Sequence, residues 1–118
     1  MSSSMAVDVS KIYVHDGTLL RVNEEPAQSR ITFEVELPDI ETETVFLPHR
    51  LVFEDVYGYR VQEGYINGCP TLLDLSVVGQ DGRWSWVRVD TTVGYREILC
   101  SAVSVHAVSE VGQPASTA

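Results

Sequence analysis

The stretch Arg30-Ile31-Thr32-Phe33-Glu34-Val35-Glu36-Leu37 decides the fold. Its apolar residues occupy every second position, from Ile31 to Leu37, and polar residues fill the positions between them. Period two places the apolar side chains on one face of a β-strand and the polar ones on the other. A helix would scatter the same residues around its circumference. The stretch therefore predicts a half-buried strand of an antiparallel sheet.

Turn signals on either side of this strand divide the chain into further short strands. Asp16-Gly17 lies between the runs 12–15 and 18–22, and Asp81-Gly82 lies between two other apolar-rich runs. Asp-Gly suits the positive φ angles of a tight turn between paired strands, so both dipeptides predict hairpins. Asn67-Gly68 predicts a third turn of this kind.

Gly94 ends a further turn, and residues 103–108 are predicted to form the last strand or a bent continuation of the strand before it. About eight to ten short strands result, and no segment shows the longer 3.6-residue periodicity of a typical helix. The predicted fold is all-β: a single-domain antiparallel sandwich or an open barrel. The prediction leaves the choice between these two open.

The length of 118 residues fits one domain. Both ends are rich in small and polar residues, which bury too little apolar surface to offset their ordering entropy. We therefore expect a disordered N-terminus over residues 1–6, an all-β domain over 7–111 and a disordered tail over 112–118.

The charge balance limits the class of partner. The chain carries 17 acidic and 8 basic residues, for a net charge of −9. This argues against nucleic acid and anionic membranes as partners, and it permits steering of a basic protein. The chain has no long apolar window for a membrane span and no secretory signal at its N-terminus, so we expect a cytoplasmic protein.

No catalytic or metal-binding motif stands out in the sequence. His15-Asp16 places an imidazole beside a carboxylate, but no nucleophile motif accompanies it, and the pair fits a turn better. His49 and His106 lack the spacing of metal ligands. Cys69 and Cys100 are expected to be buried free thiols, and a disulfide between them is the alternative. We therefore expect no enzyme, no metal and no cofactor.

An acidic stretch is the first candidate binding feature. Residues 34–43 hold five acidic side chains and no basic one. Such a patch could meet Lys or Arg on a partner and speed association. The alternative is an ordinary solvated strand face followed by a polar loop. The candidate residues are Glu34, Glu36, Asp39, Glu41 and Glu43.

A tryptophan pair is the second candidate. In the run 84–90, Trp84, Trp86 and Arg88 share one face of the predicted strand, whereas Val87 and Val89 share the other. If the valine face is the core, the tryptophans and Arg88 stand outside, where such residues often dominate protein interfaces. The alternative is that the tryptophans point inward, because large aromatic side chains bury well on either face.

The order of several runs resembles a loose group of small bacterial all-β proteins. These runs are 14–19, which begins Val-His-Asp-Gly, then 51–56, 71–75 and 94–98. Some members of the group resemble immunity proteins, which neutralise the toxins of competing bacteria. The resemblance covers about residues 12–108 and implies a binding function, with no catalytic residues.

Taken together, the charge and the resemblance predict a non-catalytic protein-binding domain, in its specific form an immunity-type inhibitor of a basic toxin domain. Two alternatives stay open. One is a structural or homo-oligomeric module joined through a β face or an edge strand, and the other is a small-molecule-binding β-barrel.

Overall fold

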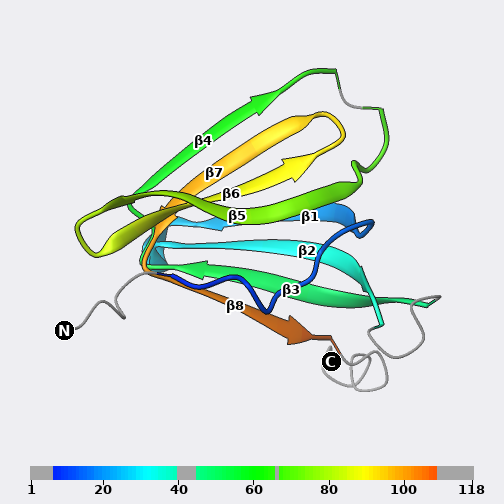
Figure 1. Cartoon of the computed structure of the whole chain (residues 1–118), viewed down its shortest axis with the longest axis horizontal. Helices are drawn as coiled ribbons and strands as arrows, with labels where there is room; N and C mark the ends of the chain where they lie inside the picture. Colours follow the sequence, from blue (N-terminus) through cyan, green and yellow to red (C-terminus); the bar gives the residue numbers. More distant parts are fainter. Residues whose placement is uncertain (1–6, 40–44, 66, 109–118) are drawn as a thin grey trace.

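The computed structural model describes residues 7–39, 45–65 and 67–108, and these form two four-stranded antiparallel sheets (Figure 1). One sheet has the order β1-β2-β3-β8 and the other the order β4-β7-β6-β5. The eight strands are β1 (Thr18–Glu25), β2 (Arg30–Pro38), β3 (Phe46–Glu54), β4 (Gly58–Glu63), β5 (Leu72–Asp81), β6 (Trp84–Thr91), β7 (Gly94–Cys100) and β8 (Ala102–Ala107). The predicted all-β sandwich is confirmed.

The core lies between the two sheets and follows the alternation along their central strands. In β2 the four apolar residues from Ile31 to Leu37 are all buried. In β6 the buried residues alternate in the same way, with Val87 and Val89 pointing inward. Phe33 and Phe53 meet in the first sheet with their ring centroids 5.0 Å apart. The strand predicted from the first sequence pattern is confirmed.

The chain passes from one sheet to the other at a corner where four strand ends meet (Figure 1). β3 leads into β4 through residues 55–57, and β7 leads into β8 through Ser101 alone. Tyr57 donates its backbone N–H to the Leu99 carbonyl at 2.7 Å, and Ser101 donates to the Glu54 carbonyl at 3.2 Å. These bonds tie the two crossing points together.

Two of the predicted hairpins are confirmed, and one is wrong. Asp81-Gly82 joins β5 to β6, and the turn before Gly94 joins β6 to β7. Asp16 does adopt a left-handed conformation, with φ 71°, but residues 12–15 form no strand. The backbone N–H of Asp16 bonds to the carbonyl of Leu72 instead, and β1 pairs with β2.

The short connection from β1 to β2 explains why β1 pairs with β2 and not with residues 12–15. A 3₁₀ turn, η2 (Pro26–Gln28), reverses the chain, and Ser29 follows it in a left-handed conformation. The short connection brings β1 directly onto the strongly alternating strand β2, so a pairing with the weaker run 12–15 does not form. Asn67-Gly68 also turns the chain, with Gly68 at φ 85°, although no hairpin strand precedes it directly.

The expected disordered ends, residues 1–6 and 112–118, lie outside the described residues. Within the described part of the chain, residues 7–17 run across the sandwich and contribute Val9 and Val14 to the core. No helix in that part is long and apolar enough to cross a membrane.

Gly94 provides a test of the β6–β7 turn. It has φ 148°, and a Cβ at this position would lie 2.0 Å from the Gln62 carbonyl oxygen. Because neither the backbone conformation nor the space suits a side chain, we expect Gly94→Ala to lower the free energy of unfolding by at least ~2 kcal/mol. Urea unfolding followed by tryptophan fluorescence measures this change.

Gly64→Ala is the matched control for Gly94→Ala. A Cβ at Gly64 would meet only the Val93 carbonyl oxygen, at 3.9 Å, which is an ordinary contact. We expect this variant to stay within ~1 kcal/mol of the wild type. Equal stability of the two variants would contradict the steric account of Gly94.

Candidate functional site

The outer face of the β4-β7-β6-β5 sheet is the strongest candidate site. Ser85, Val87 and Val89 point into the core, so Trp84 and Trp86 point outward, where both are half-buried. Arg88 lies on the same outer face. Of the two orientations that the sequence left open, the structure shows the outward one. No other described element covers this face (Figure 1).

Three arginine side chains stack on aromatic rings across this face. The guanidinium carbon of Arg60 lies 3.9 Å from the centroid of Trp86, that of Arg83 lies 4.6 Å from Trp84, and that of Arg88 lies 3.8 Å from Tyr95. Each distance is within the range of a cation–π contact. We call these six residues the arginine–aromatic face. They come from β4, the β5–β6 turn, β6 and β7.

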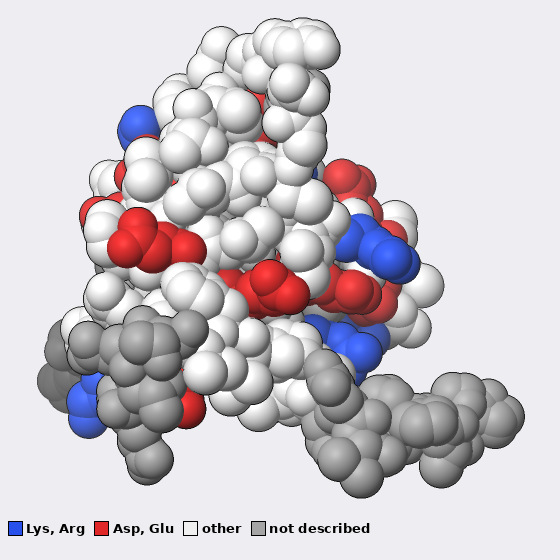
Figure 2. All heavy atoms as spheres, turned by 90° about the vertical axis from the view of Figure 1, so that its right-hand side faces the viewer, with Lys and Arg blue, Asp and Glu red and all other residues white. Residues whose placement is uncertain are grey.

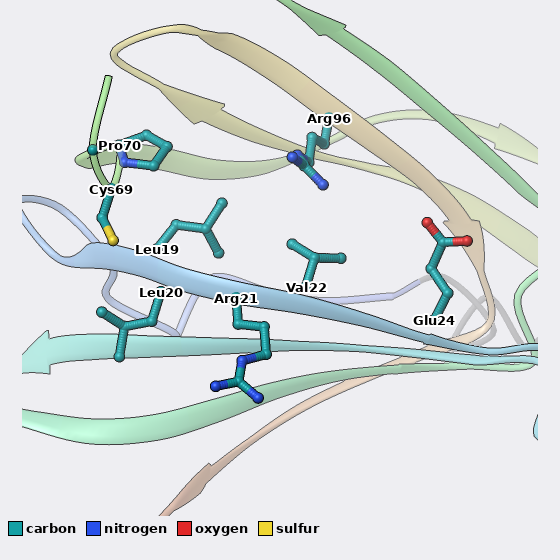
Figure 3. A pocket seen from close by; sticks show the side chains of 9 residues that line it. Leu19, Leu20, Arg21, Val22, Glu24, Cys69, Pro70 and Arg96 are labelled. Carbon is teal, nitrogen blue, oxygen red and sulfur yellow. The ribbon is translucent and has the colours of Figure 1, made fainter. Parts of the chain in front are cut away.

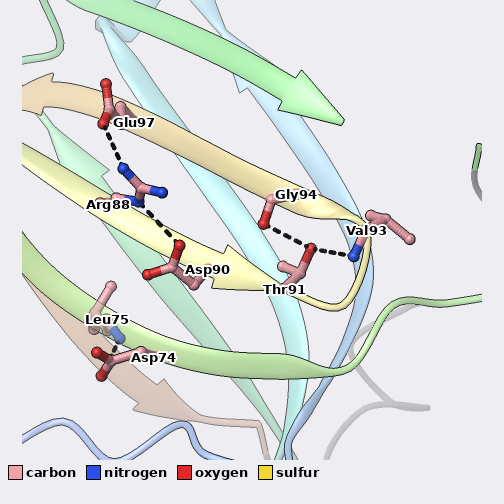
Figure 4. A network of polar contacts seen from close by, with 8 residues as sticks. All are labelled: Asp74, Leu75, Arg88, Asp90, Thr91, Val93, Gly94 and Glu97. Atoms are coloured by element: carbon pink, nitrogen blue, oxygen red, sulfur yellow. Dashed lines mark hydrogen bonds and ion pairs between the residues drawn. The ribbon is translucent and has the colours of Figure 1, made fainter. Parts of the chain in front are cut away.

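Carboxylates hold the arginines of this face in place. Glu97, whose side chain is only 11% exposed, lies 3.6 Å from Arg60 and 3.5 Å from Arg88. Arg88 also donates to Asp90 at 2.9 Å (Figure 4). In the register of the sheet, Glu97 stands directly between Arg60 and Arg88, which explains why it can pair with both. Arg60 and Arg88 therefore each have a carboxylate partner within the chain.

The corner between β3 and β4 anchors one end of the arginine–aromatic face. Asp55 accepts two hydrogen bonds from Arg83, at 2.9 and 3.0 Å, and the Tyr57 ring stacks on Trp84 with centroids 4.6 Å apart. The Trp84 indole N–H is buried and has no acceptor in hydrogen-bond geometry. It lies near the Asp55 carboxylate, and its N–H dipole contributes to the lowered pKa of Asp55. These contacts lock the β5–β6 hairpin to the corner.

The acidic stretch lies on the opposite side of the sandwich. Glu34 and Glu36 are half-buried on the outer face of the first sheet, the side of β2 away from the core. Glu34 accepts a hydrogen bond from Asn23 at 3.0 Å and lies 4.0 Å from Arg21. Asp39 follows β2, and its backbone N–H bonds to the Val45 carbonyl. Glu41 and Glu43 lie outside the described residues.

The acidic residues do not share one surface with the tryptophans. Figure 2 shows acidic side chains at several places across one face of the molecule, some of them beside basic side chains. The structure thus brings Trp84, Trp86 and Arg88 together, and it keeps Glu34 and Glu36 apart from them. The two groups share no contact surface, so they could act on one partner only through the electrostatic field of the whole molecule.

Neither the models of known protein families nor the curated proteins contain a match to this chain. The resemblance to small bacterial all-β proteins therefore stays a prediction.

The residues considered for catalysis or metal binding do not gather into one site. His15 and Asp16 are both largely exposed, with His15 Nε2 3.5 Å from the Asp16 carboxylate. His49 faces the inner side of β3 and His106 the outer side of β8, so they do not converge. Among the described residues, no three side chains of the metal-ligating types gather into a site.

The two cysteines differ from the expectation in one respect. Both thiols are free, as expected, but Cys69 is exposed and only Cys100 is buried. Cys69 sits in the loop before β5, which leaves it on the surface. Burial raises the pKa of the Cys100 thiol to about 12, so this thiol stays protonated and unreactive at neutral pH.

A cavity of about 390 Å³ opens between β1 and β7 (Figure 3). Leu19, Val22 and Glu24 of β1 point toward Arg96, which stands on the inner face of β7. Arg96 donates two hydrogen bonds to the Glu63 carboxylate, at 2.7 and 2.9 Å, and one to the Tyr59 hydroxyl. The charge of Arg96 is therefore already paired with Glu63 within the chain.

Sequence reasoning missed the partners of the tryptophans and found only the residues of β6. Arg60, Arg83 and Tyr95 complete the arginine–aromatic face from β4, the β5–β6 turn and β7. Glu97 of β7 pairs with two of its arginines. The alternation of residues 95–98 shows that Tyr95 and Glu97 share a face of one strand. It does not show that β7 lies between β4 and β6, which is what brings these side chains to Trp86 and Arg88.

The Asp55–Arg83 contact predicts a pH dependence of stability. Hydrogen bonds from Arg83, and then from Ser101, hold the pKa of Asp55 below its ordinary value of 3.8. A carboxyl with a lowered pKa in the folded state contributes stability above its unfolded pKa, and this stability is lost as the pH falls through the folded pKa. We expect Asp55→Asn to reduce the loss of stability below pH 3.8, measured by urea unfolding over a pH series.

Asn is a suitable replacement because Asp55 has φ 57°, a left-handed conformation that Asn tolerates well. Asp81→Asn is the control, since Asp81 is exposed and has no ion pair among the described residues. This control should keep the acid dependence of the wild type. An unchanged acid dependence in Asp55→Asn would show that the contact with Arg83 adds nothing to stability.

Proposed function

We propose that this protein is a non-catalytic protein-binding domain that docks its partner on the arginine–aromatic face. The observation that supports this proposal is the set of three preformed arginine–aromatic stacks on an uncovered sheet face. Tryptophan, tyrosine and arginine are the residues that most often dominate the energy of protein interfaces. Their presence together gives this face the composition of a binding hot spot.

The contacts within the face favour binding because they reduce its entropic cost. Arg60 and Arg83 keep 60% of their side chains exposed, yet each is already held by a carboxylate and by an aromatic ring. Immobilising a free side chain at an interface costs about 0.5–1.5 kcal/mol, and a side chain that is already ordered avoids most of this cost. The exposed N–H groups of both arginines are available to acceptors on a partner.

The net charge of −9 favours a basic protein as the partner. Opposite net charges speed the encounter at moderate ionic strength, even where the contact surface itself carries both signs. An immunity-type inhibitor that covers a basic toxin domain, which is the class that the sequence resemblance implies, is the specific form of this proposal.

The test uses two double variants that remove the same charge from opposite sides of the sandwich. Arg60→Ser with Arg83→Ser alters the arginine–aromatic face, and Arg21→Ser with Arg50→Ser alters the outer face of the first sheet. The tagged proteins are used to capture partners from lysate of the source cells, and the bound proteins are quantified by mass spectrometry. Circular dichroism confirms that each variant is folded.

We expect a stoichiometric basic protein to bind the wild type and the Arg21/Arg50 variant. Its recovery with the Arg60/Arg83 variant should fall at least ~10-fold, as expected for the loss of hot-spot contacts. The proposal fails if both double variants bind alike, or if no stoichiometric partner is recovered at low salt.

A further inference from the structure

Each sheet ends in two edge strands, and the start of β1 meets the residues just before β5 in an isolated bridge between Thr18 and Thr71. In the described part of the chain these edge strands are β1 and β8 in one sheet and β4 and β5 in the other. A free edge presents unpaired N–H and C=O groups that can pair with another chain. Proteins commonly block such pairing with charged side chains, prolines or β-bulges on the edge strand.

Three of the four edges carry these protective features. β1 has a register shift between Leu19 and Arg21, and its sequence ends in two glutamates followed by Pro26. β4 contains Arg60 and Glu63 within six residues. β5 has two register shifts and carries two aspartates.

β8 has none of these features. Its sequence, Ala102-Val103-Ser104-Val105-His106-Ala107, contains no acidic residue, no lysine, no arginine and no proline. Its pairing with β3 runs over six consecutive residue pairs without a register shift. Among the residues that the structure describes, β8 is therefore an open, regular edge on which a further strand can pair.

The register identifies which backbone groups of β8 are free. Val108 donates its N–H to the Pro48 carbonyl, which continues the β3–β8 register by one residue pair. In an antiparallel ladder, residues alternate between those that bond to the neighbouring strand and those that point away from it. The backbone groups of His106 and Ser104 thus bond to β3. The backbone N–H groups of Val105 and Val103 point away from β3, toward the open side of the edge strand.

Exposed apolar side chains lie beside this edge. An apolar groove of about 380 Å³ runs between residues 11–13 and the inner side of β3 and β8. Tyr13, Leu47 and Val105 in this groove are 56%, 41% and 38% exposed. Pairing at the β8 edge would bring further chain against these side chains and shield them from water.

We propose that a second copy of this chain pairs with β8, strand to strand and antiparallel, across a twofold axis. Such a contact is always self-complementary, because each copy offers the same edge to the other. Two chains that each carry a net charge of −9 repel one another, and β8 is an edge without a single carboxylate. A basic partner, by contrast, would find no acidic side chain on β8 to attract it.

The resulting dimer contains one continuous sheet with β8 of each copy at its centre. The arginine–aromatic face belongs to the other sheet, so it stays uncovered in both copies. The dimer would therefore display two copies of that face. The β8 contact and the proposed partner binding use different sheets, so either can occur without the other.

The experiment measures the mass of the untagged full chain by sedimentation equilibrium, from about 1 μM to about 1 mM, a range that covers weak dimers. We expect a concentration-dependent rise from 13.1 kDa to twice that mass. Val105→Lys places a charge on the edge, and Val105→Pro removes one outward N–H while leaving the bonds to β3. Both should weaken the dimer at least ~10-fold.

Val78→Lys is the matched control, because Val78 is an exposed valine on the other sheet's edge strand β5. It should leave the dimer unchanged, and near-UV circular dichroism checks that all variants are folded. If the wild type stays monomeric over the whole concentration range, the proposal is overturned. A strand of another protein is then the remaining candidate for pairing with β8. A dimer that Val78→Lys breaks, and that both Val105 variants leave intact, also overturns it.

Discussion

The exclusion of water from between the two sheets is the constraint on which the rest of this structure depends. Phe33 and Phe53 meet at its centre, and every second residue of β2 and β6 is buried there. Because strand side chains alternate, burying Val87 and Val89 forces Trp86 and Arg88 to the outside. The same core that stabilises the domain therefore creates the arginine–aromatic face.

Local patterns predicted most of the strands, although the run 12–15 forms none, and they did not predict which strands are neighbours. The alternation in β2 and the Asp81-Gly82 hairpin could be read directly from the sequence, since both depend on residues close together in the chain. Asp16-Gly17 shows the limit, because the dipeptide specifies a turn and does not specify which strand pairs next to it. For the same reason, Trp86 was found without Arg60, which reaches it only through the strand order.

The two candidate binding features behave differently once the strands are placed. The residues of the arginine–aromatic face support one another through stacking and through Glu97, so they form one ordered surface. Glu34 is instead drawn into contacts with Asn23 and Arg21 on its own sheet. The number of acidic residues in the sequence thus overstates the negative charge that a partner would meet on the surface. The reason is that neighbouring strands bring basic side chains beside the acidic ones.

The position of β8 at the end of the described chain has a consequence for how the domain forms. β3 and β8 pair residues that are farther apart along the chain than those of any other ladder in the described structure. Closing the loop between β3 and β8 therefore costs more conformational entropy than closing the loop of any other ladder. A chain still emerging from the ribosome cannot complete its first sheet until the last strand is released, and until then β3 is itself an open edge.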